Sequence, residues 1–153
     1  MELNVNGLAR NVEADPAALL ADVLRDRLGL MGTRLGCHEG VCGTCTVLLD
    51  DVPVRACLVL AGQADGCSVT TVEGLADGAQ LSPLQAAFVE HGASQCGFCT
   101  SGMLVSATAL LRDEPHPTVE RVRNALAGNI CRCTGYVKIV DAVMAASGVE
   151  IAS

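Results

Sequence analysis

Short runs of alternating apolar and polar positions dominate the first half of the chain, and this alternation is the pattern of half-buried β-strands. Leu3 and Val5 alternate with polar residues, Asn6-Gly7 is a typical hairpin turn, and residues 8–12 supply the returning strand. The same pattern predicts three further strands, at residues 46–49, 52–55 and 68–72. These segments together predict a small sheet.

One helix is expected between the first hairpin and the later strands, because apolar residues there recur on one face. Asp15 has the chemistry of an N-cap, Pro16 suits the first helical position, and Gly29 follows the expected end near Leu28. A loop rich in glycine and cysteine, residues 32–45, separates this helix from the next strand.

The second half of the chain has a helical pattern, and each predicted helix is ended by glycine or proline. The expected helices lie at residues 83–90, 97 to about 112, 118–127 and 136–147. Four short helices without a strand signal predict a compact helical bundle. The sequence therefore predicts an α+β chain with a sheet half and a helical half.

Composition and charge narrow the functional classes. A net charge of -7 and only two Phe, one Tyr and no Trp argue against a nucleic-acid-binding protein, which needs basic patches and stacking rings. No apolar run reaches the roughly 18 residues of a membrane span, and no secretory signal is visible. We therefore expect a cytoplasmic protein, in which nine cysteines favour metal binding over disulfides.

A first set of four cysteines has the spacing of a plant-type ferredoxin. The set is Cys37, Cys42, Cys45 and Cys57, and its first three members follow the pattern C-x4-C-x2-C. Glycines at positions 36, 40 and 43 let the loop curl and bring backbone N–H groups near a cluster. Zinc fits less well, because structural zinc uses paired ligands about two to four residues apart. This set predicts a 2Fe–2S cluster.

A second set forms the pairs C-x2-C and C-x-C, from Cys96, Cys99, Cys131 and Cys133. The first pair is expected at the start of a helix, whose positive end favours thiolates, and the second pair just before the last helix. Two facing helix starts would hold a second cluster in the middle of the bundle. The spacing alone leaves zinc open, and the upstream ferredoxin-type set favours a second 2Fe–2S cluster.

One cysteine and three histidines stay outside both sets. Cys67 heads an expected strand and is interpreted as a small apolar residue. His38 is interpreted as a solvated loop residue, and His91 and His116 as capping or solvated residues at helix ends. Because no nucleophile–histidine arrangement or phosphate-binding loop is visible, a stand-alone enzyme is not expected.

Three segments resemble the xanthine oxidase family of molybdenum hydroxylases. They are residues 36–47 (GCHEGVCGTCTV), 95–103 (QCGFCTSGM) and 128–136 (GNICRCTGY). The resemblance covers nearly the whole chain and is to the separate small iron–sulfur subunit of bacterial carbon monoxide, nicotine, quinoline and aldehyde dehydrogenases. Ser101 stands where the family commonly has Pro, and Ile130 replaces a frequent Leu. Neither departure is expected to affect cluster binding.

This resemblance implies a fold, cofactors and partners. The implied α+β fold is a plant-ferredoxin-like β-grasp domain (residues 1–74), a linker (75–82) and a four-helix bundle domain (83–153). Two 2Fe–2S clusters would lie in this chain. A large subunit would bind molybdopterin, as the cytosine dinucleotide, and a medium subunit would bind FAD, in a dimer of heterotrimers.

The resemblance also implies an electron-transfer function. Electrons would leave the molybdopterin centre, enter the cluster held by the second cysteine set, pass to the ferredoxin-type cluster and reach FAD or another acceptor. Gln95 and Cys133 would contact the molybdopterin, and the Gln amide can both donate and accept hydrogen bonds. The chain would not transform substrate itself. The alternative is a free-standing two-cluster ferredoxin, which needs no pterin contact.

Overall fold

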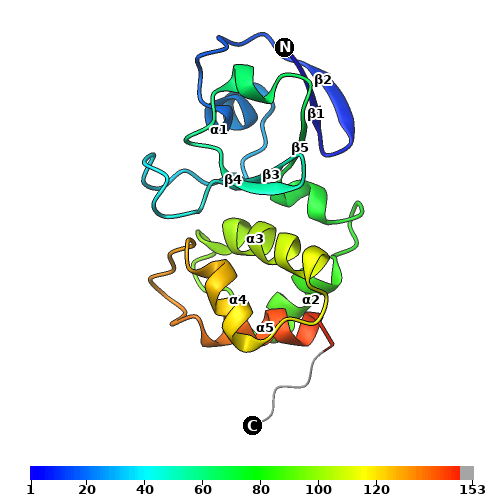
Figure 1. The fold of residues 1–153 in the computed structure, drawn as a ribbon, viewed down its shortest axis with the longest axis vertical. Helices are drawn as coiled ribbons and strands as arrows, with labels where there is room; N and C mark the ends of the chain where they lie inside the picture. The colour runs from blue at the N-terminus through cyan, green and yellow to red at the C-terminus, as the bar shows by residue number, and fades with distance from the viewer. Residues whose placement is uncertain (149–153) are drawn as a thin grey trace.

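The computed structural model describes residues 1–148, in which a mixed sheet lies against a group of helices (Figure 1). The strands are β1 (Glu2–Val5), β2 (Leu8–Asn11), β3 (Thr46–Leu49), β4 (Val52–Arg55) and β5 (Ser68–Thr70). The helices are α1 (Leu20–Asp22), α2 (Pro83–Glu90), α3 (Thr100–Asp113), α4 (Val119–Leu126) and α5 (Val137–Ala146). A sheet half followed by a helical half confirms the mixed α and β character of the chain.

The five strands are ordered β2-β1-β5-β3-β4. The β1–β5 pair is parallel and the other neighbours are antiparallel. The predicted hairpin turn is confirmed, because Asn6 and Gly7 are both left-handed, with φ of 53° and 78°. Leu3, Val5 and Val69 point into the core of this half while their neighbours face solvent, as the alternation predicts.

The first helix begins later than the sequence predicts. Leu19 is extended and forms a bridge with Leu60, so the helix begins only at Leu20. Asp15 therefore caps a turn and not a helix: its carboxylate accepts a bond from the backbone N–H two residues on, at 2.9 Å. The helix continues as a π-helical segment, Val23–Arg27. The N-cap prediction was wrong because a distant strand-like partner competes with the local helix signal.

The segment between sheet and helices is partly ordered by local turns. After β5 the chain forms a 3-10 turn, Val72–Leu75, and an isolated bridge joins Asp77 to Gln80. α2 begins with the predicted Pro83, and Ser82 caps it through the N–H of Gln85. The proposed boundaries at residues 74 and 82 stay a prediction, and residues 149–153 of the expected last domain lie outside the described part.

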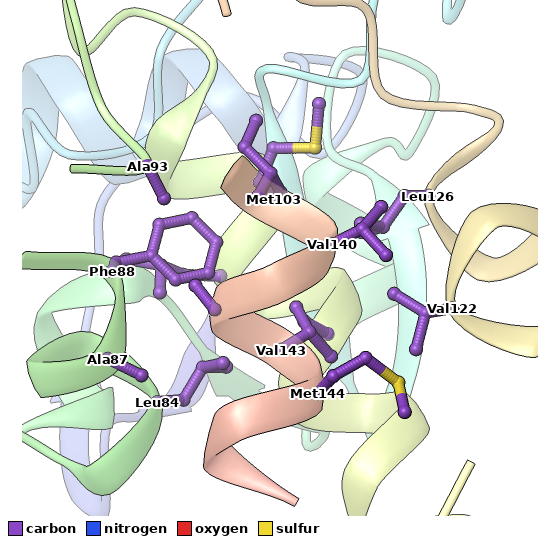
Figure 2. Close-up of a cluster of buried hydrophobic side chains, with 14 of the residues drawn as sticks. Leu84, Ala87, Phe88, Ala93, Met103, Val122, Leu126, Val140, Val143 and Met144 are labelled. Carbon is purple, nitrogen blue, oxygen red and sulfur yellow. The ribbon is translucent and has the colours of Figure 1, made fainter. Parts of the chain in front are cut away.

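The helical half has its own apolar core. Figure 2 shows Leu84 and Phe88 of α2 on one side of α5 and Val122 and Leu126 of α4 on the other. Val143 of α5 is fully buried between them. Among residues 1–148, no helix has the length and apolar character needed to cross a membrane.

Helix α3 lies between the two halves and contacts both. Leu48 of β3 packs against Val105 and Ala109 on one side of α3. Met103 and Leu104, on its other side, belong to the core of the helical half. Since α3 also begins directly after Cys99, this packing places the second cysteine set near the sheet.

Candidate metal centres

Both cysteine sets lie on loops at the same side of the molecule, where sheet and helices meet (Figure 1). Residues 36–45, drawn in cyan, precede β3, and residues 128–136, drawn in orange, precede α5. A third loop carries Cys96 into the start of α3. The described structure thus brings together cysteines that are far apart in the sequence.

Cys37 is the hydrogen-bond acceptor of the first set. The backbone N–H groups of Cys42 and Glu39 donate to its sulfur at 3.3 and 3.4 Å. These donors, with Cys42 as the larger cause, lower the pKa of the Cys37 thiol to about 6. Gly36 leaves room here, because a Cβ at this position would lie 3.1 Å from the Cys42 sulfur. The loop is built to stabilise a thiolate at Cys37.

Cys45 and Cys57 lie deeper than the other two members. Cys45 directly precedes β3 and Cys57 follows β4, and pairing of Thr46 with Arg55 brings the two cysteines to the same end of the hairpin. Each of the two cysteines is 2% exposed. Burial first, and then the neighbouring Cys57 thiol, raises the pKa of Cys45 to about 11. A positively charged metal group would offset this cost of ionising a buried thiol.

Cys96 and Cys133 form an exposed pair in the second set. The Cys133 thiol donates to the Cys96 sulfur, and the two sulfurs are 3.5 Å apart. The Phe98 backbone N–H and then the Cys133 thiol lower the pKa of Cys96, while the contact with Cys96 raises the pKa of Cys133. The sequence suggested a site in the middle of the bundle, but these two members of the set are exposed at the surface.

Cys99 and Cys131 complete the second set. Cys99 is the N-cap of α3, where the positive helix end was expected to favour the thiolate. Burial outweighs that effect and raises the pKa of the Cys99 thiol to about 12. Burial also opposes ionisation of Cys131. There, bonds from the side chain (3.0 Å) and backbone (3.4 Å) of Thr134 outweigh it and lower the pKa.

The two sets meet at one cavity of about 190 Å³. Its lining includes four cysteines of the second set and one of the first, together with apolar and polar neighbours: Gly36, Cys42, Thr44, Cys96, Phe98, Cys99, Ile130, Cys131, Arg132 and Cys133. The Ile130 N–H donates to the Cys42 carbonyl at 2.9 Å, and Ile130 is followed directly by Cys131. The first set is therefore linked to the second through the Cys42–Ile130 hydrogen bond and the peptide bond from Ile130 to Cys131.

A polar network, buried at Asn129 and more open at Arg55, holds the same loops together. The Asn129 amide nitrogen donates to the Gly43 carbonyl at 3.0 Å, and its oxygen accepts from Ser106 at 2.9 Å. Arg55 donates to Thr46 at 2.7 Å and to the carbonyl of residue 128 at 2.6 Å. Sequence reasoning missed these roles. The only available signal was that Asn129 stands inside a segment already matched to the family.

The remaining predicted residues lie outside this network. Gln95 is exposed and directly precedes Cys96. Cys67 lies away from both sets, with its thiol 3.7 Å from the Gln63 carbonyl. The pKa of Cys67 is raised, first by a hydrogen bond with Asp50 and then by burial.

The three histidines stand apart from the cysteines. His38 is exposed with φ of 58°, and His91 is the C-cap of α2. The His116 ring lies 3.1 Å from the Ser147 carbonyl at the end of α5. These positions agree with solvated and capping roles.

The donor chemistry of both sets fits iron–sulfur clusters. Thiolates are the usual ligands of 2Fe–2S clusters, and both sets offer four, with backbone or hydroxyl donors aimed at Cys37 and Cys131. Among residues 1–148, no three His, Cys, Asp or Glu side chains converge on a point for a single ion. A two-iron cluster does not need such convergence, because each iron takes only a pair of thiolates.

Comparisons with known proteins agree over nearly the whole chain. The family of 2Fe–2S iron–sulfur cluster binding domains matches residues 3–76, and the family of 2Fe–2S binding domains matches residues 71–144. The nicotine 6-hydroxylase small subunit of Paenarthrobacter nicotinovorans is 57% identical, over 97% of this chain and 89% of that protein. The nicotinate dehydrogenase small FeS subunit of Eubacterium barkeri is 49% identical, over 94% and 91%.

Solved structures share the fold. A chain in the crystal structure of quinoline 2-oxidoreductase from Pseudomonas putida 86 superposes with a TM-score of 0.94 at 49% identity. The match covers 97% of this chain and 93% of that chain. The sequence similarity and the fold similarity thus cover the same residues.

Proposed function

Because the chain belongs to the iron–sulfur subunits of the xanthine oxidase family of molybdenum hydroxylases, we propose that it carries electrons from a molybdopterin centre in a partner subunit to FAD or another acceptor. Its two 2Fe–2S clusters supply one-electron redox chemistry when they are bound. The chain is then part of an oxidoreductase and does not transform substrate itself.

The observation that carries this proposal is the meeting of two complete cysteine sets. Cys42 and all four cysteines of the second set line one cavity, and the Cys42 carbonyl is bonded to the residue before Cys131. A structural zinc module uses its metal only for folding, so its function does not depend on two sites being close together. A relay of electrons requires two redox centres to be close together.

We assign the ligands by set. One cluster would be held by Cys37, Cys42, Cys45 and Cys57, and the other by Cys96, Cys99, Cys131 and Cys133. The protein supplies thiolates and N–H donors, which stabilise negative charge on sulfur and set the reduction potential. The hydroxyl of Thr134 and the N–H of Cys42 are such donors.

We further propose that Gln95 and Cys133 face the molybdopterin. Gln95 is exposed beside Cys96, and Cys133 is exposed as well, so both are accessible to a partner subunit. The cofactor form that we propose is the cytosine dinucleotide, in a large subunit, with FAD in a medium subunit. We propose a dimer of these heterotrimers in the cytoplasm.

We also assign the two halves to known architectures. The sheet with its single short helix supports a plant-ferredoxin-like β-grasp domain at residues 1–74. The packing of α2, α3, α4 and α5 around one core supports a four-helix bundle domain from residue 83, after a linker at residues 75–82.

The test is metal and cofactor analysis of the native complex, purified through a tag on this chain. We expect about four irons per chain, two for each cluster, together with molybdenum and flavin. Iron at that level without molybdenum would favour the free-standing two-cluster ferredoxin. Zinc in place of iron would refute an electron-transfer function.

A further inference from the structure

Asn129 stands between the two cysteine sets without being a member of either. It is 2% exposed, and an amide buried to this degree is costly unless it is fully hydrogen-bonded. Here its nitrogen donates to the Gly43 carbonyl at 3.0 Å and approaches the Thr46 hydroxyl at 3.4 Å. Its oxygen accepts from Ser106 of α3 at 2.9 Å. One side chain thus binds a loop, a strand and a helix.

Asn129 and its partners belong to the segments that carry or adjoin the two cysteine sets. Gly43 lies between Cys42 and Cys45 in the first set. Asn129 itself is two residues before Cys131, and the intervening Ile130 donates its N–H to the Cys42 carbonyl. The amide of Asn129 and the N–H of Ile130 therefore hold the same loop at two adjacent points.

The backbones of the two loops and of α3 approach so closely that they cannot shift much relative to one another. A Cβ at Gly43 would overlap the carbonyl oxygen of Gly128, and a Cβ at Gly102 of α3 would overlap the carbonyl oxygen of Gly43. Because these neighbours are backbone atoms, they cannot move aside as a flexible side chain can. The spacing of the two loops is thus set by direct contact and by the bonds of Asn129.

We propose that Asn129 is a positioning residue for electron transfer: it fixes the loop of the first set against the loop of the second and so sets how fast electrons pass between the two clusters. The inference rests on the proposed function, which places a cluster at each set. Electron tunnelling slows steeply with separation and with loss of bonded contact. A residue that fixes separation therefore acts on rate without touching either cluster.

Asn129→Asp is the most selective variant. It keeps the size of the side chain and an oxygen acceptor for Ser106, but replaces the donor to Gly43 by an acceptor, so two oxygens would face each other. Leu84→Ala in α2 is the control, because Leu84 belongs to the helical core but lines a cavity with Thr108 and Leu111 toward the far end of α3. Both are made in the full chain and purified with its partner subunits.

The readouts are iron content, the magnetic interaction between the two reduced clusters in electron paramagnetic resonance, and the rate of electron transfer between clusters after rapid reduction. We expect Asn129→Asp to keep both clusters but to change the interaction signal, and to slow transfer by an order of magnitude or more. Leu84→Ala, at a similar loss of thermal stability, should leave the interaction signal and the transfer rate unchanged.

An unchanged signal and rate in Asn129→Asp with both clusters present would overturn the inference, as would an equal change in Leu84→Ala. Should Asn129→Asp not retain iron, the milder Ser106→Ala decides in its place, by the same criteria. Absence of clusters from the unmodified protein would instead refute the proposed function, so the two failures are distinguishable.

Discussion

Gly43→Ala gives a quantitative test of the contact between the two halves. Gly43 is left-handed, with φ of 73°, and is buried in the loop of the first cysteine set. A Cβ there would meet the Gly128 carbonyl, and would lie 2.8 Å from the Asn129 amide nitrogen and 3.0 Å from its Cα. Alanine at this position therefore faces both a strained backbone and an occupied space.

The two costs can be estimated separately. A left-handed backbone costs a residue with a Cβ about 1–2 kcal/mol. Overpacking against neighbours that cannot yield costs about 1–3 kcal/mol more. The free energy of unfolding should thus fall by roughly 2–5 kcal/mol in Gly43→Ala.

Gly66→Ala isolates the first cost. Gly66 is left-handed to nearly the same degree, with φ of 77°, but a Cβ there meets nothing within 4 Å. Urea unfolding of the iron-loaded chain, followed by circular dichroism and by the visible absorbance of the clusters, compares the two variants. We expect Gly43→Ala to be less stable than Gly66→Ala by about 1–3 kcal/mol. Equal stabilities would show that the loops do not pack as closely as described.

Three further predictions concern the thiols and the surface. In the full chain without clusters, alkylation should label Cys37 readily at about pH 7 and much less at about pH 5, because hydrogen bonds from Cys42 and Glu39 lower its pKa to about 6 and only the thiolate reacts. Peptide mass spectrometry reads this profile, and a midpoint near the ordinary value of about 8.5 would contradict it. Thr134→Val removes the hydroxyl donor to Cys131, so a redox titration should show a lower reduction potential, by some tens of millivolts, for the second cluster alone; a shift in both clusters would count against this assignment. Arg112→Ala breaks an exposed ion pair with Asp51 and should lower the free energy of unfolding by less than about 1 kcal/mol, an effect that salt reduces further; a larger loss in urea unfolding would mean that this pair holds the halves together.

Local chemistry made much of the fold predictable. The Asn6-Gly7 hairpin and the start of α2 at Pro83 lie where the sequence places them, because a turn and a helix start depend on neighbouring residues. The start of the first helix was not predictable, since Leu19 is held extended by Leu60, about forty residues away. Features set by residues close in sequence were predictable, whereas a feature set by a partner far along the chain was not.

The same reasoning applies to the candidate site. Spacing indicated which cysteines share a loop, because neighbouring ligands such as Cys42 and Cys45, or Cys96 and Cys99, have a fixed relation to one another. It could not show that the sets meet, because Asn129 and Gly43 are 86 residues apart in sequence. Spacing could not predict the high pKa of Cys99 either, because the burial of Cys99 depends on tertiary packing in the core of the helical half.

The burial of individual cysteines has a consequence for how the subunit meets other molecules. Cys45 and Cys57 are each 2% exposed, whereas Cys96 and Cys133 are exposed to solvent. A partner subunit or a reagent in solution can therefore contact the sulfurs of Cys96 and Cys133 directly, while the folded chain itself covers those of Cys45 and Cys57.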